Sequence, residues 1–362
     1  MALGPMDLKN FVLPTYWDAA TLEKYRLADG TTYDQLVADI AGALNIVNGE
    51  LLSEPLYSGL LSTTDELAIE YPVGDTNGFV SHTEYTKPDA QRGATTGHML
   101  PLNAYDRDLG WTWDFLRKAR RTQLDADIAS AMKDLRNVWH RRILQRLFTS
   151  TFTAVGAAGR SMPLADAGVA DPAYIPPAAP ERGGTFLATH THVLFAAGIT
   201  QANLLTAVGH VWEHNVDGPF DLLISQADLA AWTNTANVTG FVPRADSLIR
   251  YGATADLATV DESYIGAVET DYGPCRMRAN GRIPTGYWSV YKSYGAGDQR
   301  NPMRVRLGEY GVGATLLKAE GIREYPLEHA IMFTEFGEAI NDRVGAVIFR
   351  NDGGAWADPT IS

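Results

Sequence analysis

The strongest pattern in the chain is an apolar stripe at helical spacing between residues 124 and 147. Its members recur three or four residues apart, which places them on one face of an α-helix: Leu124, Ile128, Met132, Leu135, Trp139, Ile143 and Leu147. Neither Gly nor Pro occurs from residue 111 to residue 150, so no helix breaker interrupts the segment. The pattern predicts one continuous helix over residues 111–149, roughly 50 Å long at ~1.5 Å per residue.

The segment before residue 63 has a second helical stripe. Thr32 and Gln35 fit a capping box, in which each side chain satisfies the other residue's backbone N–H. The stripe that follows consists of Leu36, Val37, Ile40, Ala41, Leu44 and Val47. Asn48-Gly49 is expected to end this helix. We expect residues 1–62 to form an arm that lies either on the body of its own chain or on a neighbouring subunit.

Between these two helices the apolar period becomes two. Leu67, Ile69 and Tyr71 alternate with polar residues, and turn-forming Pro, Gly and Asn residues follow. A second run contains Phe79, Tyr85, Lys87 and Pro88. The pattern predicts a long β-hairpin over residues 63–110 with little core of its own. An isolated hairpin is marginally stable at best, so this one is expected to lie on another surface.

From residue 185 onward the pattern is typical of an α/β domain. The expected elements are a strand over 186–195, a helix over 201–215, a buried strand over 222–224 and a short helix over 226–232. Residues 260–350 are expected to form mostly short strands, the last of them over 344–349. Residues 151–185 are rich in Ala, Gly and Pro, which indicates an excursion over the surface.

Composition narrows the classes of function. The 362-residue chain has a formal net charge of −13, whereas proteins that hold nucleic acid by neutralising phosphates need a basic surface. A nucleic-acid binder of the basic-arm type is therefore excluded, although an acidic wall around DNA is not. Residues 111–149 differ, with nine basic and four acidic residues. A solvated helix face explains this excess, and a basic strip facing acidic neighbours or passing DNA is the alternative.

Cysteine content and apolar runs indicate the compartment. A single cysteine, Cys275, leaves no intrachain disulfide and no Cys-based metal site, and its expected role is a buried structural thiol. No apolar run approaches the ~20 residues that span a bilayer. The first ten residues lack the basic and apolar parts of a signal peptide. We expect a chain made and used in a cytoplasm, without a membrane partner.

The motif with the most chemical content is His210-Val211-Trp212-Glu213-His214. It fits H-x-x-E-H, in which two histidines one turn apart bind zinc and the Glu acts as general base. His190 and His192, expected on one face of a strand, bring four of the eight histidines into 25 residues. No third ligand stands out, and NVDGPF then leads into a loop. Helix-surface histidines without a metal are favoured, and a zinc hydrolase using His210, His214 and Glu213 is the alternative.

No other motif suggests chemistry. The chain lacks a P-loop, a dinucleotide-binding G-x-G-x-x-G turn and a nucleophile elbow. The glycines Gly308, Gly311 and Gly313 have no phosphate-binding Lys beside them and are expected to mark bends or bulges. We therefore predict no catalytic residue and no cofactor.

The order of these elements resembles the major capsid protein of tailed double-stranded-DNA phages, whose fold is shared with encapsulin shells. PFDLLISQADLAAW (219–232) is similar to the strand and helix that cross the axial domain of that family. GRIPTGYWSVYKSYG (281–295) is similar to its iP-x-G strand. YPLEHAIMFTEFGEAINDRVGAVIFRNDGG (325–354) is similar to the strands that return to the peripheral domain. The resemblance covers most of residues 60–354.

The resemblance implies an α+β fold with four parts. These are an N-terminal arm (1–62), an extended β-hairpin loop (63–110), a peripheral domain (111–189 and 325–362) with a spine helix (111–149), and an α/β axial domain (190–324). It implies a structural protein and no enzyme, which assembles as hexamers and pentamers into an icosahedral shell around packaged double-stranded DNA. The expected location is the virion capsid, after assembly in the host cytoplasm. An encapsulin-type compartment for a cargo enzyme is the alternative.

The resemblance also implies partners. Intersubunit contacts are expected from the arm and the loop, with the candidates Phe79, Tyr85, Lys87, Arg92, Leu36, Ile40 and Leu44. Some members begin with a long helical scaffold region that is later cleaved, whereas this chain has a short arm. A separate scaffolding protein or a mature product is therefore implied, with portal and decoration proteins as further partners. In members that cross-link a loop Lys to a neighbour's Asn, the matching pair here is Lys87 and Asn351.

Overall fold

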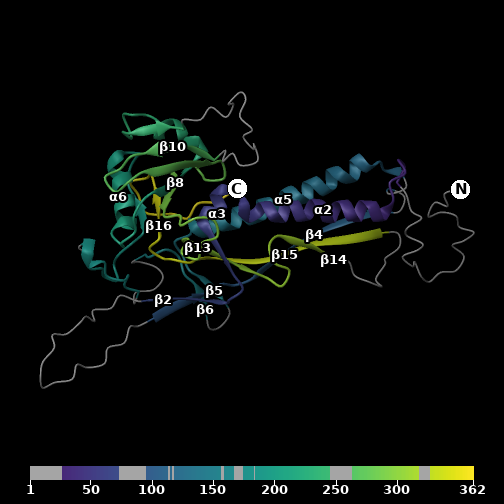
Figure 1. Ribbon diagram of the computed structural model, residues 1–362, viewed down its shortest axis with the longest axis horizontal. Helices are drawn as coiled ribbons and strands as arrows, with labels where there is room; N and C mark the ends of the chain where they lie inside the picture. Colours follow the sequence, from purple (N-terminus) through teal and green to yellow (C-terminus); the bar gives the residue numbers. More distant parts are fainter. Residues whose placement is uncertain are drawn as a thin grey trace, which may run out of the picture. The chain divides into compact units, whose positions relative to one another are not determined.

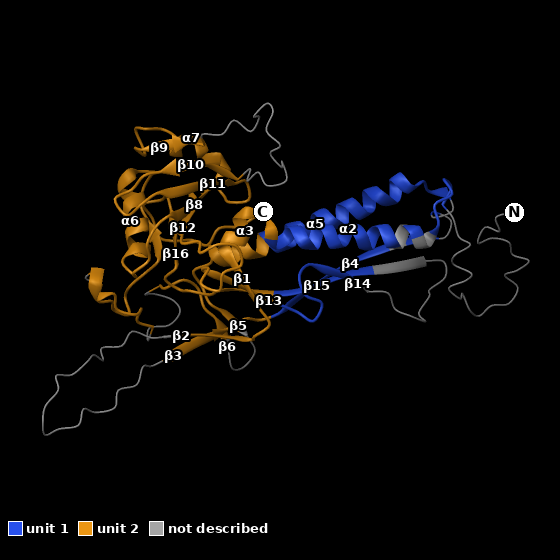
Figure 2. Cartoon of the chain, viewed as in Figure 1, with its two compact units in different colours: residues 1–52, 102–140, 307–336 blue, residues 53–101, 141–306, 337–362 orange. Residues whose placement is uncertain are grey.

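The computed structural model describes residues 27–72, 95–112, 115, 118–155, 159–166, 174–182, 184–244, 263–317 and 327–362 (Figure 1). The chain divides into two compact units, which Figure 2 colours separately. Unit 1 comprises residues 1–52, 102–140 and 307–336, and unit 2 comprises residues 53–101, 141–306 and 337–362. Helix α5 (Arg121–Leu147) and strand β15 (Leu327–Ile340) contribute residues to both units.

Helix α2 (Tyr33–Ser53) begins where the sequence predicts and ends later. The backbone N–H of Thr32 donates to Gln35 Oε1 (3.0 Å) and that of Gln35 donates to Thr32 Oγ1 (3.3 Å), which confirms the capping box. Asn48 does not end the helix, because its side-chain amide pairs with the backbone of Ala314. Asn48 Nδ2 donates to Ala314 O (2.8 Å) and Asn48 Oδ1 accepts from Ala314 N (3.0 Å). This tertiary pairing satisfies the side chain that locally favours a helix stop.

The predicted long helix is α5, and its start was predicted ten residues too early. Trp111 and Thr112 belong to strand β4 (Asn103–Thr112), which pairs antiparallel with β15 from Asn103↔Phe336 to Thr112↔Leu327. The apolar stripe begins only at Leu124, so the residues before it lack a helical apolar pattern. Their structure is decided by cross-strand pairing instead. All seven stripe residues are buried, which confirms the predicted helix face.

Unit 1 joins α5 to a small sheet. Strand β14 (Ala314–Leu317) pairs with β15 from Ala314↔Thr334 to Leu317↔Ile331. The indole Nε1 of Trp139 on α5 donates to Thr334 Oγ1 (3.1 Å), and the Trp139 ring stacks on Phe336 at 4.1 Å. The glycines before β14 mark bends as predicted, because Gly311 and Gly313 have positive φ angles of 76° and 84°.

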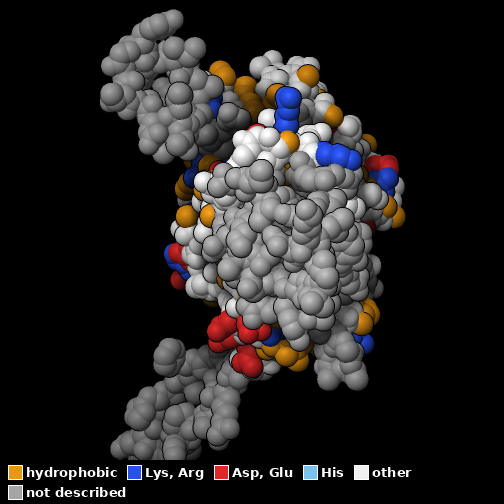
Figure 3. Space-filling view, turned by 90° about the vertical axis from the view of Figure 1, so that its right-hand side faces the viewer, with side chains coloured by type: hydrophobic (Ala, Val, Ile, Leu, Met, Phe, Trp, Pro, Cys, Tyr) orange, Lys and Arg blue, Asp and Glu red, His pale blue; other side chains and the backbone are white. Residues whose placement is uncertain are grey.

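Many basic side chains of α5 have partners within the chain. The ion pairs are Arg121–Asp39 (2.8 Å), Arg121–Asp125 (2.6 Å), Arg136–Glu50 and Arg142–Glu338 (2.7 Å). Arg146 is buried and donates to the carbonyl oxygens of Thr151 (3.1 Å) and Ser161 (3.3 Å). On the face drawn in Figure 3, described basic and acidic side chains both occur, beside hydrophobic ones. At least four of the nine basic side chains of this segment therefore have acidic or carbonyl partners in their own chain.

Unit 2 contains a seven-stranded mixed sheet in the order β7-β16-β12-β8-β11-β10-β9. The strands are β7 (Val193–Phe195), β16 (Ala346–Arg350), β12 (Tyr287–Tyr291), β8 (Phe220–Ser225), β11 (Cys275–Asn280), β10 (Tyr264–Val268) and β9 (Phe241–Pro243). Central β8 is buried along its whole length, as predicted for 222–224. The C-terminal strand β16 pairs with β12 and β7, although the sequence placed it with the peripheral segment. The first four residues of β16 are buried, so its apolar run needs the cover that a central position provides.

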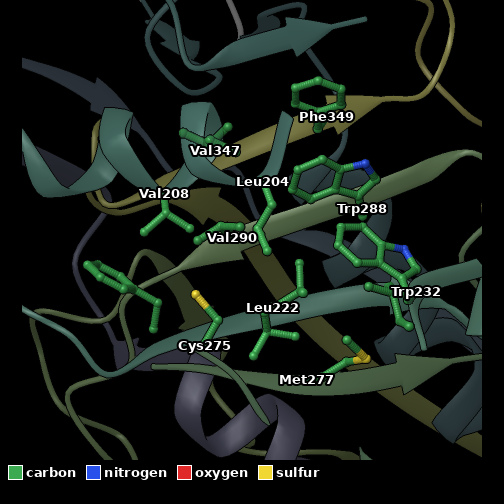
Figure 4. Close-up of a cluster of buried hydrophobic side chains, with 14 of the residues drawn as sticks. Leu204, Val208, Leu222, Trp232, Cys275, Met277, Trp288, Val290, Val347 and Phe349 are labelled. Atoms are coloured by element: carbon green, nitrogen blue, oxygen red, sulfur yellow. The ribbon is translucent and has the colours of Figure 1, made fainter. Parts of the chain in front are cut away.

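Helix α6 (Gln201–Trp212) packs on β12 and β16 of this sheet. Thr200 caps it by accepting from Asn203 N (3.2 Å). Figure 4 shows Leu204 and Val208 of α6 beside side chains of the sheet. Trp288 stacks on Phe349 at 4.4 Å and meets Trp232 edge-on at 5.0 Å. Cys275 is fully buried in this core, and burial raises the pKa of its thiol to about 12, which confirms the structural role predicted for it.

Shorter elements complete the description. They are α3 (Pro55–Leu60), β1 (Leu61–Thr64) parallel to β13 (Met303–Leu307), β5 (Thr153–Val155) paired with β6 (Gly159–Ser161), η1 (Pro180–Arg182), and η2 (Gln226–Asp228) followed by α7 (Leu229–Trp232). Helices η2 and α7 together form the short helix predicted over 226–232. No helix in the described part of the chain is long and apolar enough to cross a membrane.

Candidate functional site

The predicted extended loop begins and ends in a hairpin stem. Strand β2 (Ala68–Pro72) pairs antiparallel with β3 (Thr95–Met99), from Ala68↔Met99 to Pro72↔Thr95. The second described strand begins at Thr95, and the predicted second run, from Phe79 to Pro88, lies outside the described residues. The contact candidates Phe79, Tyr85, Lys87 and Arg92 lie outside the described residues, so their roles, and the Lys87–Asn351 pairing, stay predictions.

Buried side chains fix the base of this stem within unit 2. Ile69 packs with Leu100 and Ala339. The Tyr71 ring meets the rings of His98 and Tyr174 edge-on, with centroid distances of 5.6 and 5.4 Å. Burial lowers the pKa of His98 to about 3, and the nearby cations of Arg146 and Arg343 add to the effect. The imidazole is therefore neutral at physiological pH, and the stem rests on an aromatic base beside buried arginines.

The arm candidates on α2 are covered by their own chain. Ile40 and Leu44 are only 4% and 5% exposed, and nothing is described of the Leu36 side chain. Ile40, Leu44 and Val47 of the stripe are thus buried within their own chain. The intersubunit contacts expected from Ile40 and Leu44 stay predictions. Among the described side chains of α2, the exposed large apolar one is Ile46, 65% exposed, which the stripe pattern missed because it lies off the stripe.

Three histidines meet in unit 2 near the end of α6. His190 and His192 come just before β7, and His214 comes just after α6. Their Nε2 atoms form a triangle whose three sides are each 3.0 Å. Within the described part of the chain they are the group of His, Cys, Asp and Glu side chains spaced to hold a metal ion. The Phe186 ring stacks on His214 at 4.2 Å and lies 4.8 Å from the His190 ring.

All three imidazoles are held in their neutral form. Burial is the main cause: it lowers the pKa of His190 to about 4, that of His214 to about 3, and that of fully buried His192 well below its usual value. Repulsion from neighbouring histidines adds to the effect. The Nδ1 of His192 lies 2.8 Å from the carbonyl oxygen of Ala346, which can only accept a hydrogen bond. Nδ1 therefore carries the proton and Nε2 keeps a free lone pair, the form that binds metals.

The H-x-x-E-H motif does not supply the ligand pair predicted from it. Helix α6 ends at Trp212, and Asn215 has a positive φ of 69°, so His214 leaves the helix and joins His190 and His192. His210 stays on α6, where its Nδ1 lies 2.9 Å from Thr206 O and its ring stacks on His190. A zinc pair at i and i+4 needs a helix through both residues. The structure therefore gives no support to the alternative of a zinc pair at His210 and His214, because His210 stays on α6 outside the triangle.

Two further expectations about this cluster are corrected in detail. His190 and His192 were expected on a strand over 186–195, but the strand begins at Val193. Their Nε2 atoms nevertheless lie together, 3.0 Å apart. The Glu213 carboxylate, which is the general base only in the alternative zinc-hydrolase hypothesis, lies 3.4 Å from His190 Nε2 and is 32% exposed. It lies beside the triangle and is not one of its three members.

Comparison with known proteins identifies the fold. No family model matches the chain, and no curated protein matches its sequence. A solved structure from Mycobacterium phage Patience is 20% identical, aligns over 96% of this chain and 97% of that chain, and has a TM-score of 0.64. The mature capsid of bacteriophage PhiM1 is 10% identical over 81% of this chain and 85% of that one, with a TM-score of 0.46. The SrpI encapsulin of Synechococcus elongatus PCC 7942 is 13% identical over 82% and 89%, with a TM-score of 0.41.

The match to the Patience structure extends over nearly the whole of both chains, so the similarity is one of complete folds. The elements of the chain also follow the order predicted from the sequence for an α+β fold: helical arm, hairpin, long helix, α/β sheet and returning strands. The chain therefore has the fold of the Mycobacterium phage Patience structure.

Proposed function

We propose that this chain is the major capsid protein of a tailed double-stranded-DNA phage, a structural subunit that assembles into an icosahedral shell. The observation that carries the proposal is the fold match to the Mycobacterium phage Patience structure, at 96% coverage of this chain and 97% of that one. A fold alone does not determine function. The H-x-x-E-H motif is the one enzyme-like feature of the sequence, and its His210 lies outside the group of side chains spaced to hold a metal ion.

The proposed shell consists of hexamers and pentamers of this chain. Residues 73–94, between the two strands of the β2–β3 stem, are proposed to reach a neighbouring subunit through Phe79, Tyr85, Lys87 and Arg92. Such contacts close by rotation into rings, as a shell requires. The proposed peripheral domain comprises 111–189 and 325–362, and the proposed axial domain comprises 190–324. Strand β16 of the former pairs with β12 and β7 of the latter.

Further partners follow from this role. A separate scaffolding protein directs assembly in the host cytoplasm, a portal occupies one vertex, and decoration proteins bind outside the finished virion capsid. The shell encloses double-stranded DNA without reading its sequence. A net charge of −13 supports this arrangement, because DNA that is packed in by a motor does not need to adhere to the wall.

The first test is expression of the chain alone, followed by light scattering and negative-stain imaging of the same fraction. Hexamers, pentamers or closed shells are the expected result. The contents of any shells then separate two uses of the fold, since packaged nucleic acid fits a capsid and a packaged enzyme fits an encapsulin. A monomer or dimer that stays small at high concentration, with crowding agents and in the presence of the proposed scaffolding protein would count against a shell subunit.

A further inference from the structure

We propose that His190, His192 and His214 bind a divalent transition-metal ion, with zinc as the best match, and that the ion fastens the segment before β7 to the end of α6. The three side chains are separated by up to 24 residues in the sequence, and their Nε2 atoms are 3.0 Å apart. The site is structural and independent of any hydrolase chemistry. It also goes beyond shell formation, because it concerns the stability of one subunit.

The first argument is that the triangle cannot satisfy itself through hydrogen bonds. A neutral imidazole presents either one N–H or one lone pair at Nε2. With three nitrogens at mutual distances of 3.0 Å, at least one pair must then face lone pair to lone pair or N–H to N–H. The carbonyl of Ala346 fixes the His192 Nε2 as a lone pair, so that ring has no proton to share. A cation among the three nitrogens removes the conflict.

The second argument is that the dimensions suit a small cation. An ion at the usual zinc–nitrogen distance of ~2.05 Å from each Nε2 would lie about 1.1 Å above the plane of the triangle. At 3.0 Å, the sides are a few tenths of an ångström shorter than the ~3.3 Å of ideal tetrahedral zinc. Small ring rotations close that gap. The fourth coordination position lies on the side of the ion away from the triangle.

The third argument concerns the surroundings that orient the ligands. Metal-binding histidines commonly donate their other ring N–H to a backbone carbonyl, as His192 does to Ala346. The His214 ring stacks on the Phe186 ring, with 4.2 Å between the ring centroids. Among the described residues its Nδ1 has no hydrogen-bond partner, so Nε2 provides its polar contact. The Glu213 carboxylate, with Oε1 3.4 Å from His190 Nε2, places negative charge beside the ion.

The donor set selects the kind of metal. Three imidazole nitrogens are borderline-soft ligands that suit zinc, copper, nickel or iron. Calcium and magnesium require oxygen ligands, and the triangle offers none. Zinc accepts three histidines readily and has no geometric preference of its own, which fits a site whose shape the backbone of α6 and the segment before β7 already determine.

The test is the metal content of the full-length chain, purified without a histidine tag and incubated with zinc. About one zinc per chain is expected after gel filtration. His190→Ala and His214→Ala should each lose it. His210→Ala is the matched control, because His210 lies on the same helix and stacks on His190 but is not in the triangle; this variant should keep its zinc. Loss of zinc in His210→Ala with retention in His190→Ala would overturn the assignment, as would a wild-type chain that binds less than about a tenth of an equivalent.

A second measurement covers variants that fail to fold. Chelation of the wild-type chain should remove the zinc, leave the far-ultraviolet circular dichroism unchanged and lower Tm, because the ion binds the native state only. Cobalt added to the chelated protein should give the visible absorption of a tetrahedral nitrogen site. An unchanged Tm with no cobalt spectrum would also overturn the proposal. Both readouts use the soluble subunit, so failure of shell assembly would leave this test intact.

Discussion

Two glycines of unit 1 show how differently one residue type can act. Gly313 has a φ of +84°, and a Cβ there would overlap the side-chain amide of Asn48, which pairs with Ala314. We expect Gly313→Ala to lower the free energy of unfolding by ~2–3 kcal/mol, since backbone strain and the displaced amide add together. Gly42→Ala on α2 is the control, because nothing lies within 4 Å of its added Cβ; it should raise stability by up to ~1 kcal/mol. Urea denaturation compares the two, and equal effects would refute the explanation.

His98 makes stability depend on pH. Its pKa in the folded chain is about 3, against a usual 6.5, mainly because the ring is buried. When pH falls below 6.5 the unfolded chain takes up a proton that the folded chain refuses, so stability is lost between pH 6.5 and 3. The loss from this group between pH 7 and pH 5 is roughly 2 kcal/mol.

Replacing His98 tests this dependence. His98→Gln has no group that titrates in this range, so its unfolding midpoint in urea should fall less than that of the wild-type chain between pH 7 and pH 5. The variant is expected to be less stable at pH 7, because it leaves an amide in a buried site. The informative quantity is therefore the slope with pH. Parallel slopes for the two proteins would show that His98 does not titrate as described.

At the scale of elements, we expect apolar packing, more than ion pairing, to hold α5 against the other elements of unit 1. Trp139 is fully buried, stacks on Phe336 and donates to Thr334. Trp139→Ala should lower the free energy of unfolding by ~3–5 kcal/mol. The Arg136 and Glu50 side chains of one ion pair are 44% and 53% exposed. Glu50→Gln should change the free energy of unfolding by less than ~1 kcal/mol, because water screens the pair. Denaturant titration of both variants decides between these contributions, and a large loss in Glu50→Gln would reverse their ranking.

The same elements show what a sequence reveals. The capping box of α2 and the apolar face of α5 depend on residues three or four apart, so local spacing predicts them. The actual start of α5 and the end of α2 depend on partners more than 200 residues away, namely β15 for Trp111 and Ala314 for Asn48. No local pattern contains these pairings, which is why both boundaries were misplaced.

The histidine cluster follows the same rule. Four histidines lie within 25 residues. The alternative drawn from the motif paired His210 with His214, whereas the structure brings His214 together with His190 and His192. The correct group requires the turn after Trp212, which carries His214 away from α6 and toward His190 and His192. A motif that assumes a continuous helix fails when the helix ends inside it.

At the scale of the whole molecule, the hairpin stem is where folding and assembly can be separated. Gly97 in β3 faces β2 so closely that an added Cβ would lie 2.5 Å from the carbonyl oxygen of Ile69. Gly97→Ala should therefore disturb the β2–β3 pairing while leaving the seven-stranded sheet intact, since the stem is a separate two-stranded sheet. If residues 73–94 connect subunits as proposed, shell yield should fall severalfold while the cooperative thermal transition remains.

Gly281→Ala is the control for this experiment, because it also lies in unit 2 and nothing is within 4 Å of its added Cβ. Circular dichroism melting and light scattering are measured on the same preparations of both variants and of the wild-type chain. A folded Gly97→Ala chain that forms shells at the wild-type concentration would show that the stem geometry is dispensable for assembly. A folded chain that stays small, beside a control that assembles, would locate subunit contacts in the segment that the stem holds, because the described core of the seven-stranded sheet contains no residue of the stem.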